Sequence, residues 1–158
     1  MNALAQFVAI GAISLTAAGA TYLIKGPPQR FFVCDPASLK PGEICLAQAP
    51  AGIAILWVDG RSRAQWQKDG LPGSVLWNLD PTEDMQAFET GIAMRVLETP
   101  RVIVYCSDEN CGLSHEIAKR IIALDLGAEV SVLKGGWRAL NEAGRISKSN
   151  TSPQQDLK

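Results

Sequence analysis

The sequence predicts an α/β fold, with a central, mostly parallel sheet flanked by helices and preceded by one transmembrane helix. Two observations support the sheet. Short apolar runs alternate along the chain with segments whose apolar residues recur at helical spacing. These runs are also continuous rather than alternating, which is typical of strands buried on both faces. The transmembrane helix is predicted from a long uncharged run near the start of the sequence.

Residues 4–24 form this uncharged run of 21 residues. A helix needs ~20 apolar residues to cross a bilayer core. We therefore favour a transmembrane anchor, or an uncleaved signal-anchor, over residues 1–25. A cleaved signal peptide is an alternative, because residues 18–20 are small and suit a cleavage site. A buried soluble helix is a third interpretation, but a helix that is apolar on all sides needs a larger protein around it.

The charges that flank this run indicate its orientation. Lys25 and Arg30 follow it, and no basic residue precedes it. The positive-inside rule therefore predicts that the following domain lies in the cytoplasm, although two charges leave an outward-facing domain open. Residues 26–37, which contain three prolines, are expected to form a linker.

The remaining elements are expected in the following order. A short helix begins near Pro41, with Ile44 and Cys45 on its apolar side. Strands are predicted at 54–58, 75–77, 102–105 and 130–133. Helices are predicted at 61–68, 82–97, 113–124 and 137–143. The domain spans 38–144, and the polar tail 145–158 is expected to be disordered.

Composition excludes several classes of protein. The chain has 158 residues, and its 15 basic and 16 acidic side chains give a net charge of −1, so we expect no nucleic-acid partner. A hydrophobic share of 47% is high enough to form a core. Four cysteines are too few for a small disulfide-stapled domain, and a single histidine excludes a His-rich metal site. We expect no metal and no cofactor.

Cys106 is the candidate nucleophile. It ends the predicted strand 102–105 and begins a polar loop that leads into a helix. Backbone N–H groups of such a loop, and the partial positive charge at a helix N-terminus, favour a thiolate over a thiol. The alternative is a buried, inert cysteine.

Four segments stand in a characteristic order along the chain: Asp59-Gly60-Arg61, Trp66 with Asp69–Ser74, Val104–Cys106 and Leu133–Trp137. Together they resemble the rhodanese-like domain, the sulfurtransferase family. The resemblance implies that Cys106 takes a sulfane sulfur from a small donor such as thiosulfate and passes the persulfide sulfur to a thiol acceptor. It also implies structural roles for six residues: Asp59, Arg61, Pro72, Gly73, Gly135 and Gly136.

The loop after Cys106 departs from the family pattern. It is about two residues longer and lacks the arginine that is often present, and it consists of Ser107, Asp108, Glu109, Asn110, Cys111 and Gly112. Asp108 and Glu109 add negative charge beside the candidate site, which disfavours anionic donors such as thiosulfate. A longer loop also resembles the phosphatase and arsenate-reductase branches of this fold, and the acidic pair counts against those equally.

The other cysteines and the histidine leave alternatives open. Cys111 is either a resolving thiol, which attacks the Cys106 persulfide to form a disulfide, or a small loop residue. A metal site that also uses His115 is disfavoured, because a structural zinc site needs four ligands. Ser114 is expected to cap the helix, and His115 to be exposed. Cys34 and Cys45 could form a disulfide in an oxidising compartment, but we favour Cys45 as an apolar-face residue.

Three functions remain. The first is a membrane-tethered sulfurtransferase that carries a persulfide on Cys106, with a small sulfur donor, a thiol acceptor and the membrane, through residues 4–24, as its partners. The second is a non-catalytic module that binds a protein partner. The third is a thiol–disulfide switch that uses Cys106 and Cys111.

Overall fold

A computed structural model describes residue 6 and residues 32–107 and 112–146 of the chain. Clustering divides the chain into two units, residues 1–31 and residues 32–158. Within the described part, no helix is both long and apolar enough to cross a membrane. The predicted anchor at residues 4–24 lies outside the described residues except for Gln6, so it stays a prediction.

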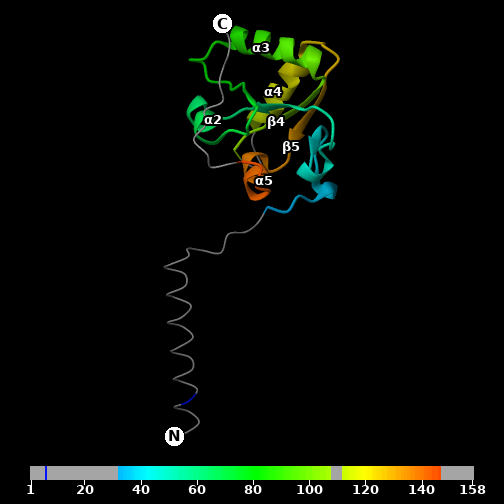
Figure 1. Ribbon diagram of the computed structural model, residues 1–158, viewed down its shortest axis with the longest axis vertical. Helices are drawn as coiled ribbons and strands as arrows, with labels where there is room; N and C mark the ends of the chain where they lie inside the picture. Colours follow the sequence, from blue (N-terminus) through cyan, green and yellow to red (C-terminus); the bar gives the residue numbers. More distant parts are fainter. Residues whose placement is uncertain (1–5, 7–31, 108–111, 147–158) are drawn as a thin grey trace. The chain divides into compact units, whose positions relative to one another are not determined.

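The folded unit contains alternating strands and helices (Figure 1). The strands are β1 (Glu43–Ile44), β2 (Leu56–Asp59), β3 (Val75–Leu76), β4 (Arg101–Tyr105) and β5 (Glu129–Leu133). The helices are α2 (Arg63–Asp69), α3 (Met85–Glu98), α4 (Gly112–Ala123) and α5 (Gly136–Glu142), with short 3₁₀ turns at Pro36–Ser38 and Leu46–Gln48.

The strands described form one parallel sheet in the order β1-β5-β4-β2-β3. The register pairs Val104 with Val58 on one side and with Val132 on the other. This arrangement confirms the α/β fold with a parallel sheet flanked by helices. Because all the strands run in one direction, the loops that follow them meet at one edge, which is where sites form in such sheets.

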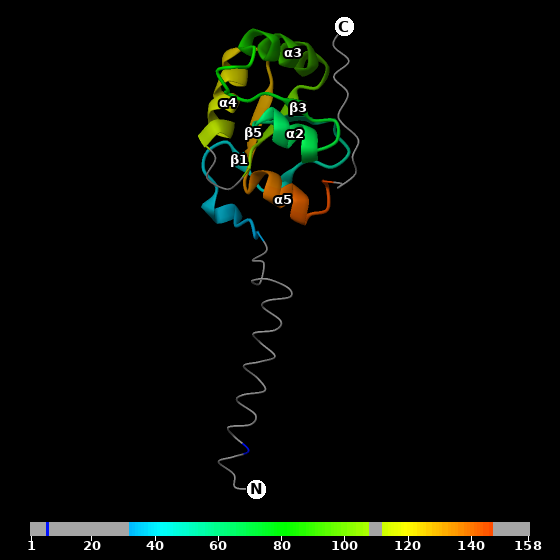
Figure 2. The same ribbon diagram turned by 90° about the vertical axis from the view of Figure 1, so that its left-hand side faces the viewer.

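Two apolar clusters cover the two faces of the sheet. Val102 and Val104 of β4 pack in the first cluster, together with α3 and α4. Ile103 and Tyr105 of the same strand pack in the second, with Leu140 of α5. This alternation places α3 and α4 on the opposite side of the sheet from α5 (Figures 1 and 2). It also explains why β4 is an unbroken apolar run, since every side chain from Val102 to Tyr105 is buried.

The beginning of the domain differs from the sequence prediction. The helix expected from Pro41 is instead the two-residue strand β1, which pairs with β5. A strand this short has too few residues to show a periodic pattern, so its partner on β5 decides its conformation. The folded part also extends beyond the predicted bounds 38–144, because Phe32 contacts the domain and Ile146 is buried.

Candidate functional site

The carboxyl ends of the central strands bring the predicted site residues to one edge of the sheet. Cys106 follows β4, Gly60 follows β2, and Lys134 follows β5. The Gly60 backbone N–H donates to the Tyr105 carbonyl at 2.7 Å, and this bond joins the end of β2 to the end of β4. The candidate nucleophile therefore leaves the sheet at its centre, with a strand end on each side.

Cys106 is almost completely buried, with 1% of its surface exposed. The hydroxyl of Ser114 on α4 donates toward its sulfur, with an Oγ–Sγ distance of 3.7 Å. Cys106 is disulfide-bonded in this structure. Cys34 and Cys45 bond to each other, and Cys111 lies outside the described residues.

The structure describes the two ends of the predicted active-site loop. Ser107 is exposed, and Gly112 is the first residue of α4. The predicted loop residues Asp108, Glu109, Asn110 and Cys111 lie outside the described residues.

Ser114 does not cap α4 as expected. It lies inside the helix, two residues after its start, and is 3% exposed. Its hydroxyl donates toward the sulfur of Cys106. Sequence reasoning missed this role because Ser is a common N-cap, and the true helix start is two residues earlier.

The turn after β5 holds the backbone of Cys106 in place. Gly135 and Gly136 both have positive φ, +80° and +49°, which favours glycine at these positions. The following residue, Trp137, donates its backbone N–H to the Cys106 carbonyl at 2.6 Å. A Cβ on Gly135 would meet the ring of Phe32, and the structural roles implied for the two glycines stay predictions.

Asp59 and Arg61 form a buried ion pair beside the site. The Arg61 guanidinium donates to both oxygens of Asp59 at 2.9–3.2 Å, and to Oδ1 of Asp69 at 2.8 Å. Neither Asp59 nor Arg61 is more than 5% exposed. Burial acts to lower the pKa of Arg61, but its hydrogen bonds to the two aspartates outweigh this, so the pKa is raised overall. The pair ties the loop after β2 to the end of α2.

Two aromatic residues extend this network across the edge. The Arg61 guanidinium lies 5.4 Å from the ring centre of Trp137 and 5.9 Å from that of Tyr105. The Trp137 indole N–H donates to the Asp69 carbonyl at 2.9 Å. Sequence analysis placed Tyr105 and Trp137 only within motif segments, and their contacts show that both brace the site.

Tyr105 also orders the turn that contains Pro72 and Gly73. Its hydroxyl accepts the backbone N–H of Leu71 at 3.0 Å and donates to Ser74 Oγ at 3.3 Å. Burial raises the pKa of Tyr105 well above its usual value. Pro72 and Gly73 are exposed, and Gly73 has φ +79°, so they shape a surface turn.

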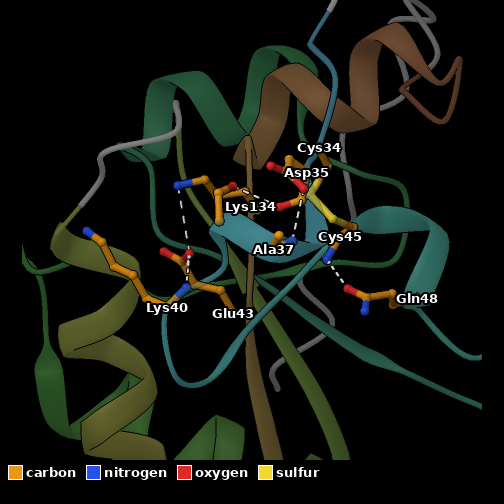
Figure 3. Close-up of a disulfide and its surroundings, with 9 residues drawn as sticks. Cys34, Asp35, Ala37, Lys40, Glu43, Cys45, Gln48 and Lys134 are labelled. Atoms are coloured by element: carbon orange, nitrogen blue, oxygen red, sulfur yellow. Dashed lines mark hydrogen bonds and ion pairs between the residues drawn. A yellow bond between two sulfur atoms is a disulfide. The ribbon is translucent and has the colours of Figure 1, made fainter.

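A second ionic cluster lies at the edge strand and was missed entirely. The buried carboxylate of Glu43 on β1 lies 3.2 Å from His115 Nε2 and 3.7 Å from Lys134 Nζ. His115, expected to be exposed, is two-thirds covered. Glu43 also accepts the Lys40 backbone N–H at 2.9 Å (Figure 3). Because the sequence predicted a helix here, it gave no sign that Glu43 points into the domain.

Cys34 and Cys45 form a disulfide, contrary to our preference for Cys45 as a simple apolar-face residue (Figure 3). Cys45 directly follows β1, which places the disulfide at the same sheet edge as Cys106. Its Cα lies 5.7 Å from that of Cys34, within the range that a disulfide allows. Cys45 was expected on the apolar face of a helix, but the segment before it is the strand β1. After this strand, the Cys45 side chain meets Cys34.

Metal ligands do not gather among the residues that the structure describes. No group of three or more His, Cys, Asp or Glu side chains there could hold a metal ion. Glu43 lies beside both His115 and Lys134, and the positive charge of Lys134 disfavours the binding of a metal cation there.

Comparison with known proteins identifies a family. A family model described as "Rhodanese-like domain" matches residues 45–143, which is more than half of the 158 residues. No curated protein matches the chain.

Several solved structures are similar to this chain at low identity. A thiosulfate sulfurtransferase from Pseudomonas aeruginosa is 18% identical, with a TM-score of 0.49 and coverage of 80% of this chain and 22% of that one. An As–Sb reductase from Leishmania major is 18% identical, with a TM-score of 0.45 and coverage of 57% and 65%. The BH2092 protein from Bacillus halodurans is 20% identical, with a TM-score of 0.44 and coverage of 66% and 70%.

Proposed function

Because this chain belongs to the rhodanese-like domain family, we propose that it is a membrane-tethered sulfurtransferase that carries sulfane sulfur as a persulfide on Cys106. The observation that carries the proposal is the position of the Cys106 sulfur. It lies at the carboxyl end of the central strand, and the Ser114 hydroxyl donates toward it. A hydroxyl donor stabilises an anionic sulfur, which is the form that attacks the donor and the form that the persulfide takes.

The reaction consists of two sulfur transfers with no net oxidation. The Cys106 thiolate attacks the outer sulfur of a persulfide-type donor, RS–S⁻. The S–S bond of the donor breaks, RS⁻ leaves, and the Cys106 persulfide forms. An acceptor thiolate then attacks the outer sulfur of that persulfide, takes it, and releases the Cys106 thiolate. The brace of Trp137 on the Cys106 carbonyl keeps the backbone in place during both steps.

The sequence of the loop favours donors with little negative charge. Asp108 and Glu109 stand two and three residues after Cys106. Their charges repel a dianion such as thiosulfate more strongly than a singly charged persulfide or polysulfide. We therefore expect a polysulfide-type donor to react faster than thiosulfate.

A second function is favoured by one observation, the disulfide bond of Cys106. In this case Cys111 attacks the inner sulfur of the Cys106 persulfide. A Cys106–Cys111 disulfide forms, and hydrosulfide (HS⁻) leaves with the displaced sulfur. Such a protein is a thiol–disulfide switch, which needs a dithiol reductant to restore its two thiols. A non-catalytic module that binds a protein partner remains the third hypothesis.

Mass spectrometry of the reduced full-length chain separates these functions. After incubation with a polysulfide, the transferase predicts one added sulfur on Cys106, which cyanide removes. The switch predicts transient addition followed by loss of two hydrogen masses. In Cys111→Ser, the switch is abolished and the added sulfur persists. Cys106→Ser is the matched control and should gain no sulfur. If the wild-type chain gains no sulfur from polysulfide or thiosulfate and forms no disulfide, the sulfurtransferase and the thiol–disulfide switch are both refuted, and the binding module remains.

The membrane tether and its orientation belong to the same proposal. Residues 4–24 are long and apolar enough to anchor the domain. The flanking charges predict a cytoplasmic domain, whereas the Cys34–Cys45 disulfide favours the outward-facing arrangement, because disulfides persist in oxidising compartments and are rare in the cytosol. We propose the outward orientation. Labelling of Lys40, which is exposed, by a membrane-impermeant amine reagent in intact cells would support it, and labelling only after lysis would refute it.

A further inference from the structure

The first described segment of the domain crosses the edge of the sheet where Cys106 lies. We call residues Phe32–Cys45 the N-terminal strap. It contains the 3₁₀ turn Pro36–Ser38 and ends just after β1. The Cys34–Cys45 disulfide closes it into a loop (Figure 3). Most side chains between the two cysteines are exposed. β1 and the buried Glu43 attach one end of the strap to the sheet, and the disulfide ties the other end, next to Phe32, to that attachment.

Phe32 is the part of the strap that reaches the site. Its ring fills the space that a Cβ on Gly135 would occupy. Its backbone N–H donates to Glu142 Oε2 on α5. The ring therefore lies on the turn that connects β5 to α5, on the side where glycine leaves room for it.

That turn is also what holds Cys106. Gly135 and Gly136 lead into Trp137, whose backbone N–H donates to the Cys106 carbonyl at 2.6 Å. The Trp137 indole is fixed on its other side by the Asp69 carbonyl at 2.9 Å. Glycines loosen a turn, because they have more backbone freedom than other residues. A ring packed on Gly135 removes part of that freedom.

We infer that Phe32 is a positioning residue for Cys106, and that the Cys34–Cys45 disulfide regulates the site by holding Phe32 on the Gly135 turn. The regulatory role of the disulfide rests on the proposed function of Cys106 as the sulfur carrier. A dithiol reductant switches the strap by breaking the Cys34–Cys45 bond. It gives two electrons and two protons to the two sulfurs, and becomes a disulfide itself. β1 keeps the far end of the strap on the sheet, so after reduction Phe32 is held by its own contacts with Gly135 and Glu142.

The physical reason for a switch is local stability. Segments with few buried contacts open at a much lower free energy than the core. A disulfide that closes a short loop removes conformational freedom from the open state. Without the bond, Phe32 leaves Gly135 more often, and the hydrogen bond from Trp137 to Cys106 breaks more often with it.

Amide hydrogen exchange in the full-length chain tests this directly. In Cys34→Ala/Cys45→Ala and in Phe32→Ala, we expect the Trp137 amide to exchange faster by about tenfold or more. The Val104 amide in the middle of β4 should stay within about twofold of wild type. Val33→Ala is the matched control, because its side chain is in the same strap and is 83% exposed, and it should change neither amide.

Combining the substitutions separates positioning from simple loss of stability. If the disulfide acts through Phe32, adding Phe32→Ala to the double cysteine variant speeds Trp137 exchange no further. Additive effects, an equal rise at Val104 and Trp137, or unchanged exchange at Trp137 would each overturn the inference.

A second measurement, the alkylation rate of the Cys106 thiol, tests the effect of the strap on Cys106 independently of sulfur transfer. In a Cys111→Ser background, Cys106 is expected to be a free thiol while Cys34–Cys45 stays oxidised. We expect its alkylation rate to rise severalfold on removal of the strap disulfide or of the Phe32 ring, since Cys106 is 1% exposed when the strap is in place. If alkylation responds but no persulfide forms, the proposed function fails while the positioning role stands. If persulfide forms at the same rate with and without the strap disulfide and alkylation is unchanged, the positioning role fails alone.

Discussion

Removing Arg61 tests whether the ionic network at the sheet edge is structural. In Arg61→Ala, the fully buried carboxyl of Asp59 loses its ion-pair partner. Leaving one charge of a buried pair uncompensated costs about 3–5 kcal/mol. This is a large part of the roughly 5–15 kcal/mol by which a domain is typically stable. We therefore expect the free energy of unfolding to fall by about 3–5 kcal/mol.

Urea unfolding of the full-length chain, followed by tryptophan fluorescence, measures this change. The matched control is Arg101→Ala, because Arg101 pairs with Glu129 on the surface, where the side chains are 30% and 64% exposed. Such a pair contributes about 0–1 kcal/mol. Asp59→Asn is a milder second variant, which keeps the side-chain shape and removes the charge. If Arg61→Ala and Arg101→Ala lose the same stability within about 1 kcal/mol, the buried network is not what holds this edge together.

Three further predictions concern residues around the site. Tyr105 has a raised pKa, so the unfolded chain loses this proton above about pH 10 while the folded chain keeps it. Stability should therefore fall by up to about 1.4 kcal/mol per pH unit above that point, more steeply than in Tyr105→Phe when urea midpoints are compared. At neutral pH, Tyr105→Phe should cost about 1–3 kcal/mol, because the buried Leu71 N–H loses its acceptor; an unchanged urea midpoint would contradict that hydrogen bond. Gly135→Ala should cost more than Gly144→Ala, since both have positive φ but only Gly135 meets a neighbouring ring; equal thermal midpoints would show that Phe32 yields freely.

The sequence predicted the centre of the fold well, and its limits have physical causes. The strand 102–105 was recognisable because burial on both faces leaves an unbroken apolar run. The helices on either side were recognisable because their apolar residues recur at helical spacing. Cys106 could be singled out because it stands where that run ends. The short strand β1 could not be predicted, because two residues show no periodic pattern and their conformation depends on pairing with β5.

The error at β1 spread to its neighbours. Once a helix was assumed, Cys45 was expected on an apolar face, and Glu43 was not expected to meet His115. Both contacts depend on a strand partner far along the chain, which a single sequence does not reveal. The Ser114 hydroxyl was misassigned for a local reason, because the helix began two residues before the expected cap.

The network around Arg61 also has a consequence for how the chain folds. Its contacts join residues that are distant in sequence: Tyr105 and Leu71 are separated by 34 positions, and Trp137 and Asp69 by 68. Contacts of long sequence separation form slowly, because a large loop must close before they gain any energy. During synthesis, Asp59 and Arg61 emerge long before Trp137 can cover them. The edge that carries Cys106 is therefore expected to assemble last, and a nascent chain that ends before Trp137 would expose a partly built ionic cluster.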